Sequence, residues 1–180
     1  MSRLVVLRGV RDAKEAIWQS TGTYGTVRDI SAIRQANMEL ELDTDQQEGD
    51  DEIIDRYSRV IGATISMQQA RVDLQVASDF TGGTFETGAD YDEFLLDGEN
   101  DPNFVGLAFK VVASDGKEAH YFFPKCKLSG NLSLEAGYGA YTVPSAEFQA
   151  IKDGAAGTML WRIFESATAL DIPLATAVDA

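Results

Sequence analysis

The stretch Ile53–Gly83, IIDRYSRVIGATISMQQARVDLQVASDFTGG, changes its hydrophobic period halfway along. Apolar and polar residues alternate over residues 61–68, which predicts a strand with one buried face. Val72, Val76 and Phe80 then recur every four residues before two glycines, which predicts a short amphipathic helix that the glycines end. Because so short a helix is unstable alone in water, we expect its apolar side to pack on the sheet that contains the strand.

Strand signals dominate the rest of the chain. Apolar segments are separated by turn sequences, of which Asp115-Gly116 is the clearest hairpin signal. The other expected strands are residues 12–19 (one helical turn is the alternative), 38–43, 104–113, 118–123, 128–134, 140–150 and 158–165. The predicted fold class is mainly β with one flanking α-helix, in a closed or sandwiched sheet such as a β-sandwich or half-barrel. Such a sheet must close on itself or offer its edges to another chain.

A length of 180 residues fits a single domain over residues 1–180, and no internal repeat is present. We expect residues 1–11 and 166–180 to be arms that become ordered on assembly. The apolar run Leu4–Leu7 is too short for a signal peptide, and no segment is long enough to span a membrane. These features predict a soluble protein made in a cytoplasm, with no membrane partner.

Acidic residues outnumber basic ones, 29 Asp and Glu against 15 Lys and Arg, which gives a formal net charge of −14. This balance argues against a function in nucleic-acid binding, which depends on neutralising phosphates. Nine acidic residues and no Lys or Arg lie between Glu39 and Asp55. We therefore interpret Asp43–Glu52 as an exposed loop between two strands. It is either simply solvated or a projecting element that contacts another subunit.

Residue patterns that support catalysis or metal binding are sparse. The single histidine, His120, has no serine in a nucleophile turn to partner it, so we interpret it as structural. The single cysteine, Cys126, is interpreted as a buried thiol, with a Cys-His pair to His120 as the alternative. The acidic connection at residues 86–101 suggests calcium, but its spacing does not fit the helix-loop-helix calcium site. No phosphate-binding loop, dinucleotide fingerprint or zinc cluster occurs, so we predict a protein that is not an enzyme and has no cofactor or metal.

The turn and strand sequences along residues 1–165 follow one another in a specific order. In the first half they are Tyr24-Gly25, the acidic segment ending Gly49-Asp50-Asp51, the strand start Asp55-Arg56-Tyr57-Ser58, and Gly62–Met67 leading to a helix closed by Thr81-Gly82-Gly83. In the second half they are the Phe104–Phe123 hairpin, Lys125–Gly130 and Tyr138–Tyr141. This order resembles the major tail proteins, or tail tube proteins, of long-tailed bacteriophages.

The resemblance implies a β-sandwich or half-barrel with a flanking helix that assembles as hexameric rings. Stacked rings of this family form a tube that holds the tape-measure protein and then conducts DNA during genome ejection. The resemblance thus implies a virion tail location, assembly in the host bacterial cytoplasm, and the chain itself, the tape-measure protein and other tail proteins as partners. Unsatisfied sheet edges and a negative lumen that does not bind DNA specifically agree with this hypothesis.

Within this hypothesis, we expect the acidic segment to contact arginines of a neighbouring subunit. The candidate interface residues are Asp43, Asp45, Gln46, Gln47, Glu48, Asp50, Asp51 and Glu52 on one side, and Arg3, Arg8, Arg11, Arg28 and Arg34 on the other. Two other classes stay open. One is a capsid decoration or head-tail joining protein. The other is a non-catalytic carbohydrate- or calcium-binding β-sandwich, in which Tyr91, Tyr138 and Tyr141 would form a platform for a sugar.

Overall fold

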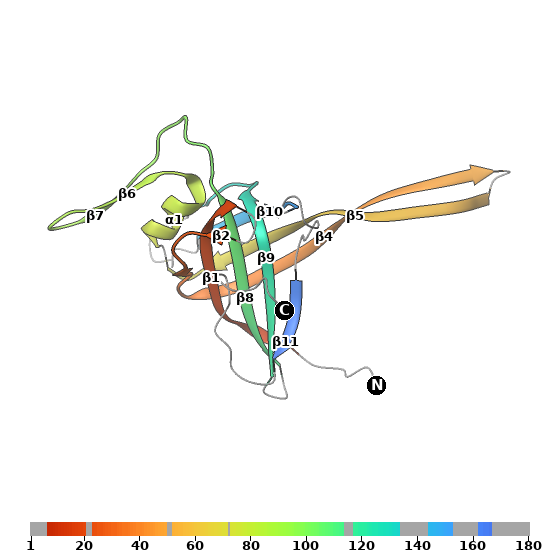
Figure 1. The fold of residues 1–180 in the computed structure, drawn as a ribbon, viewed down its shortest axis with the longest axis horizontal. Coiled ribbons are helices and arrows are strands. Elements are labelled where there is room, and N and C mark those ends of the chain that lie inside the picture. Colours follow the sequence, from red (N-terminus) through yellow and green to blue (C-terminus); the bar gives the residue numbers. More distant parts are fainter. Residues whose placement is uncertain are drawn as a thin grey trace, which may run out of the picture.

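The computed structural model describes residues 7–20, 23–49, 52–71, 73–113, 117–133, 144–152 and 162–166 (Figure 1). In these residues the chain forms a nine-stranded sheet, a separate two-stranded sheet and one α-helix, so the prediction of a mainly β fold with one helix is confirmed. The elements are β1 (Leu7–Ser20), β2 (Thr23–Tyr24), β3 (Arg28–Asp29), β4 (Ile33–Gly49), β5 (Glu52–Gln69), α1 (Leu74–Thr81), β6 (Thr84–Thr87), β7 (Asp92–Leu95), β8 (Phe104–Ala113), β9 (Glu118–Leu128), β10 (Ser145–Ala150) and β11 (Arg162–Ser166).

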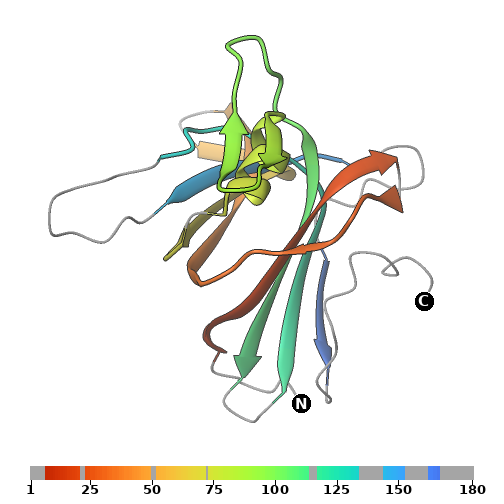
Figure 2. The ribbon, with the colours of Figure 1, turned by 90° about the vertical axis from the view of Figure 1, so that its left-hand side faces the viewer.

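The large sheet has the strand order β2-β1-β8-β9-β10-β5-β4, with β3 also paired to β1 and β11 to β9. In Figures 1 and 2, β1, β8 and β9 lie side by side, and the β4–β5 hairpin crosses them. The short link between β3 and β4 joins the two parts of the sheet. In this link the Ile30 N–H donates to the Ala13 carbonyl at 2.8 Å, and the Ala70 N–H donates to the Ala32 carbonyl at 2.9 Å. The sheet therefore curls around one core.

The core lies on the inner face of the curled sheet, where α1 covers it. Phe80 of α1 packs edge-on against Phe148 of β10, with ring centroids 4.7 Å apart. Burying one such side chain contributes about 2 kcal/mol, so these contacts stabilise the docked helix. The other buried members of the core cluster are Ala13, Ile30, Ala63, Ile65, Met67, Val76, Val105, Leu107, Phe109, Phe123, Cys126, Ala146 and Ala150.

The helix predicted from the four-residue period is confirmed, and its ends follow local chemistry. The Asp73 carboxylate accepts hydrogen bonds from two backbone N–H groups of the first turn, so Asp73 is the N-cap. Gly82 ends the helix with φ of 74°, a left-handed conformation that glycine adopts without strain. Val76 and Phe80 are buried as predicted, while Val72 lies outside the described residues.

The predictions of two acidic loops are wrong. Asp43–Glu52 was expected to be a loop, but β4 and β5 stay paired out to Gly49 and Glu52, leaving only Asp50 and Asp51 outside the described residues. The arginines that oppose the acidic strand lie just beyond Asp55, on the following part of β5. The charge of Asp43–Glu52 considered alone therefore does not indicate that it can pair. The second segment, residues 86–101, contains the whole of β7 and the end of β6, paired in a small hairpin.

Most of the remaining strand predictions are confirmed. Residues 12–19 lie in β1, and residues 104–113 and 118–123 form β8 and the first part of β9. Leu7–Arg11, at the end of the expected N-terminal arm, belongs to β1. Beyond Leu128 the expected strand stops, although Ser133 forms an isolated bridge to Ser145. Residues 1–6, 134–143, 153–161 and 167–180, which carry the rest of these expectations, lie outside the described residues.

Candidate functional site

The β4–β5 hairpin projects well beyond the body of the molecule (Figure 1). Near the body its inner face is part of the core, through Ile65 and Met67. Farther out, polar cross-strand pairs hold the two strands together. Arg59 Nη2 lies 3.0 Å from Asp43 Oδ2, and the Thr44 and Ser58 hydroxyls are 3.2 Å apart. These pairs explain how a strongly acidic segment forms regular strands.

An apolar stripe runs from the core out along this hairpin. Leu40 pairs with Ala63 and Leu42 pairs with Val60, and residues paired across two strands share a face. Leu40 and Leu42 lie on the same face of β4 as Met38, which packs against the core, so they continue the core surface past the point where α1 and the other strands cover it. Their exposed fractions are 44% and 59%, and that of Val60 is 47%. A bulge beside Leu42 adds Ile61, which is 51% exposed.

The acidic candidates on this hairpin lie only in part among the residues that the structure describes. Asp43, Asp45 and Gln46 are exposed, and Asp43 is paired with Arg59 of its own chain. The backbones of Gln47, Glu48 and Glu52 belong to the paired strands. Asp50 and Asp51 at the tip lie outside the described residues.

The arginine candidates have different surroundings. Arg28 is engaged within the chain, with its Nε 2.6 Å from Asp79 Oδ2. Arg11 and Arg34 are exposed, on β1 and at the base of β4. The backbone of Arg8 pairs with Val112 in β8, and Arg3 lies outside the described residues.

The outer face of β4, β5 and β10, opposite the core, is polar in the part nearest the body of the molecule. Thr64 donates to Glu41 at 2.5 Å, and Gln149 donates to the other oxygen of Glu41 at 3.2 Å. A hollow of about 390 Å³ opens over part of this face, around Ser66 and Glu147. The three cross-strand rows of the face are Gln35, Gln68 and Ser145; Asn37, Ser66 and Glu147; and Glu39, Thr64 and Gln149.

Cations are absent from these three rows, which carry only two carboxylates, those of Glu39 and Glu147. Lys127 of β9 borders the face beside Gln149, but its ammonium is paired with Asp101 at 2.8 Å. Sequence reasoning missed this face, although its signal is the polar half of the alternation in residues 61–68 together with that in residues 35–41.

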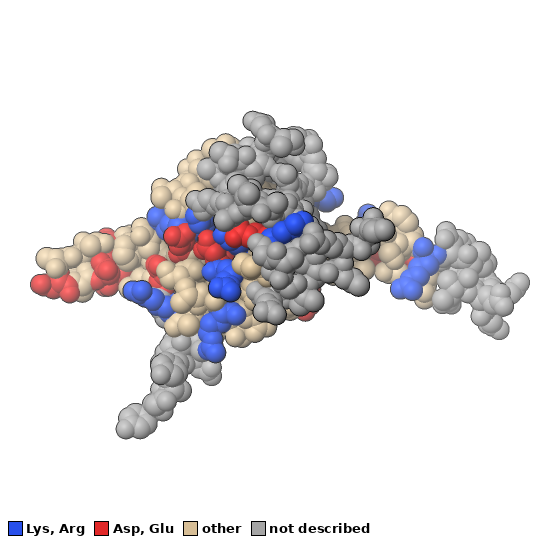
Figure 3. All heavy atoms as spheres, turned by 90° about the horizontal axis from the view of Figure 1, so that it is seen from below, with Lys and Arg blue, Asp and Glu red and all other residues tan. Residues whose placement is uncertain are grey.

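The β6–β7 hairpin projects at the opposite end of the long axis from the β4–β5 hairpin (Figure 1). Asp and Glu side chains gather on it (Figure 3). It also exposes Tyr91, Leu95 and Leu96, with exposed fractions of 67%, 48% and 55%. No group of side chains that suits a metal ion occurs in the described parts of the chain, this hairpin included. The molecule therefore carries an exposed apolar and acidic projection at each end.

The two residues considered for catalysis are both buried. Burial raises the pKa of the Cys126 thiol, which keeps it protonated and unreactive. His120 is 1% exposed, and its Nε2 lies 3.6 Å from Glu118 Oε2, which is itself beside Lys110. Burial lowers the pKa of His120, so the ring is neutral at neutral pH. The interpretation of Cys126 as a buried thiol is confirmed.

Comparison with known proteins adds no relative. No protein-family model matches the chain, and no curated protein matches it. Among the described residues, α1 is the only helix, and it is neither long nor apolar enough to cross a membrane.

Proposed function

We propose that this chain is a structural virion protein that polymerises as stacked rings, hexameric in the simplest arrangement, into the tail tube of a long-tailed phage. The observation that carries the proposal is the β4–β5 hairpin, whose apolar stripe of Leu40, Leu42, Val60 and Ile61 continues the core surface but stays about half exposed among the described residues. Exposed apolar surface of this kind marks a protein contact. A second copy of the chain is the occupant that we propose.

The placement of the two hairpins supports contacts between different surfaces of neighbouring copies. They lie at opposite ends of the long axis, so each end of one copy is available to a different neighbour (Figure 1). Contacts between unlike surfaces build closed rings or open filaments, as a tube of stacked rings requires. The exposed Arg11 and Arg34 remain candidates to meet the carboxylates of a neighbouring β4–β5 hairpin.

The polar outer face of β4, β5 and β10 suits the wall of a DNA conduit. Its three cross-strand rows nearest the body offer hydroxyl and amide groups, two carboxylates and no cation, and the next row adds the carboxylate of Glu41, so this part of the face has nothing that would hold phosphates. In the proposed tube this face lines the lumen. DNA then passes without specific binding after the tape-measure protein has left, and the location is the virion tail, assembled in the cytoplasm of the host bacterium.

Negative-stain electron microscopy of the purified protein tests this function. We expect hollow tubes with a regular axial repeat at high protein concentration. The matched variant replaces residues 41–62, the part of the hairpin that carries Leu42, Val60 and Ile61, by Asn-Gly, which makes a short hairpin turn between the paired residues Leu40 and Ala63. This variant should keep the circular dichroism spectrum and cooperative melting of the parent body but form no tubes.

Uniform particles without tubes, from the wild type with tail proteins present, would reject the proposal and favour the capsid decoration or joining class. Calcium-dependent melting or binding to a glycan array would instead favour the carbohydrate- or calcium-binding class. Tubes formed equally well by the shortened variant would show that the chain polymerises through another surface.

A further inference from the structure

A carboxyl group is buried where the sheet meets α1. Glu15, on the inner face of β1, has no exposed surface, and neither of its carboxyl oxygens accepts a hydrogen bond from a described donor. Leaving an ionised carboxylate in this state would cost several kcal/mol. The surroundings of Glu15 therefore decide whether it is ionised at all.

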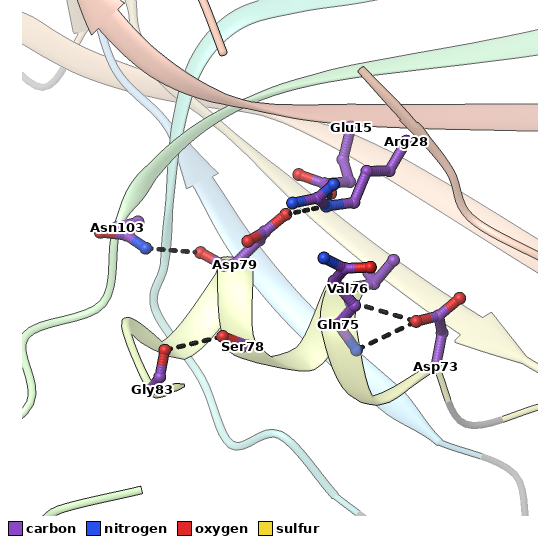
Figure 4. A network of polar contacts seen from close by, with 9 residues as sticks. All are labelled: Glu15, Arg28, Asp73, Gln75, Val76, Ser78, Asp79, Gly83 and Asn103. Carbon is purple, nitrogen blue, oxygen red and sulfur yellow. Dashed lines mark hydrogen bonds and ion pairs between the residues drawn. The ribbon is translucent and has the colours of Figure 1, made fainter. Parts of the chain in front are cut away.

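One cation lies between Glu15 and a second carboxyl group. Arg28 Nε is 3.9 Å from Glu15 Oε1 but only 2.6 Å from Asp79 Oδ2. Figure 4 shows the carboxyl groups of Glu15 and Asp79 both turned toward the Arg28 side chain. Since the guanidinium is committed to Asp79, ionised Glu15 would add a second negative charge to a site with one positive charge.

The other described elements packed around Glu15 do not supply a second cation. From α1 the charged groups are Asp79 and, farther off, the N-cap Asp73. From β3 the group is Arg28, and from β8 the residue opposite Glu15 is the uncharged Leu107. The next ion pair along β1 and β3, Lys14 with Asp29, belongs to the opposite face of the strand because side chains alternate.

We propose that Glu15 and Asp79 share one proton beside Arg28, and that this proton holds α1 on β1. With the proton present, Glu15 is a neutral donor that faces the Asp79 carboxylate, and the cluster carries one negative and one positive charge. Without it, two carboxylates compete for one guanidinium across the boundary between sheet and helix. Repulsion and desolvation then both favour an undocked α1.

Release of α1 would have consequences outside this cluster. It would uncover Phe148, against which Phe80 packs, and the inner face of the sheet. It would also free the β6–β7 hairpin, which follows α1 directly and pairs only with itself. The proton on Glu15 thus controls the position of one of the two projecting hairpins.

A carbon-13 NMR titration of the side-chain carboxyl groups tests the shared proton directly. Burial and the Asp79 charge raise the pKa of Glu15 to about 9, against a partial opposing effect of Arg28, so its carboxyl signal should titrate near that value. The signal is assigned by its disappearance in Glu15→Gln. A midpoint at the ordinary value of 4.5 would overturn the proposal.

Hydrogen exchange of the α1 amides tests the effect on docking. After correction for intrinsic exchange, wild-type protection of Val76–Phe80 should fall as the pH rises from 4.5, the ordinary pKa of Glu15, to about 9, its pKa with α1 docked. The fall should be roughly tenfold per pH unit. Glu15→Gln, which has the shape of the protonated group, should keep constant protection. Asp29→Asn, a change in the neighbouring exposed pair, should behave like the wild type.

A second variant covers the case in which Glu15→Gln fails to fold. In Asp79→Asn the guanidinium of Arg28 has no other carboxylate, so the Glu15 midpoint should fall by a unit or more. Protection of α1 that does not change with pH in the wild type, or an unchanged Glu15 midpoint in Asp79→Asn, would overturn the proposal.

Discussion

Arg28 and Asp79 form an ion pair with an Nε to Oδ2 distance of 2.6 Å, which joins β3 to α1 across 51 positions of sequence. The two side chains are 27% and 10% exposed, so the pair is largely shielded from water. The Asp79 carbonyl also accepts a hydrogen bond from the Asn103 amide at 3.0 Å. The middle of α1 is therefore tied on one side to β3 and on the other to the segment before β8.

Removing the cation of this pair should destabilise the fold strongly. Arg28→Met keeps the aliphatic volume but leaves Asp79 buried without its partner, beside Glu15. Loss of one partner of a buried pair costs about 3 kcal/mol, and we expect a decrease of this size in the free energy of unfolding. Urea denaturation followed by circular dichroism measures it.

The neighbouring cross-strand pair of β1 and β3, Lys14 with Asp29, supplies a matched control for this variant. Lys14 lies 3.7 Å from Asp29, whose side chain is 72% exposed. Asp29→Asn removes an exposed pair between the same two strands and should cost less than about 1 kcal/mol. Equal effects of the two substitutions would contradict the assignment of Arg28 as the buried link to α1.

His120 should make stability depend on pH in the slightly acidic range. Burial lowers the pKa of His120 below 6.5, while Glu118 acts in the opposite direction. The unfolded chain then binds a proton at a higher pH than the folded chain, so the free energy of unfolding falls as the pH drops below 6.5. The slope should be at most about 1.4 kcal/mol per pH unit.

His120→Gln isolates this contribution from the other titrating groups. Denaturant midpoints of both proteins are measured over a pH series that brackets the ordinary histidine pKa, and the difference between them is plotted. The difference should shrink on the acidic side. A difference that does not vary with pH would mean that His120 has the same pKa in both states.

Gly82 should not tolerate a side chain. Its φ is 74°, and an added Cβ would meet the carbonyl oxygen of Asp101, a backbone atom that cannot move aside easily. Gly82→Ala should lower the free energy of unfolding by about 1 to 2 kcal/mol or more. Gly98→Ala is the control, because an added Cβ there meets nothing within 4 Å. Thermal melts measure both variants. Equal decreases of the melting temperature would show that the left-handed conformation of Gly82 does not limit stability.

The sequence predicted those elements whose signal is local. The alternation in residues 61–68, the four-residue repeat ending at Phe80 and the glycine stop depend on neighbouring residues alone, and all three recur in the structure. The error at Asp43–Glu52 has a different origin. The charge of this segment alone indicates a loop, but the arginines that oppose it lie on the partner strand of the hairpin, outside the segment.

The candidate site was predicted only in part, for a related reason. The sequence pointed to the acidic segment but not to the stripe formed with Leu42 and Val60, because their exposure depends on where the covering elements stop. Similarly, Glu15 reads as an ordinary surface residue in the pattern of β1. Its burial follows from the docking of α1, which contributes Asp79 from 64 positions later in the chain.

The apolar stripe should matter for assembly and not for folding. Leu42→Ser combined with Val60→Ser removes apolar surface that is already half exposed, so the melting temperature should change little. The yield of sedimentable tubes should fall several-fold, because each interface loses buried apolar area at every copy. Thr44→Ala with Ser58→Ala alters the next pair outward on the same face and should leave the yield unchanged. An unaffected yield in the Leu42 and Val60 variant would exclude the stripe as a contact.

The polar sheet face should change the behaviour of assembled tubes when it gains positive charge. Ser66 lies in the middle row of this face, between Asn37 and Glu147. Ser66→Lys places an ammonium there in every copy, so tubes should retain DNA, with binding that weakens steeply as salt increases. Ser66→Gln has a side chain of similar reach without charge and should pass DNA as the wild type does. Co-sedimentation of labelled DNA with tubes measures this, and absence of retention by the lysine variant would place the face away from the lumen.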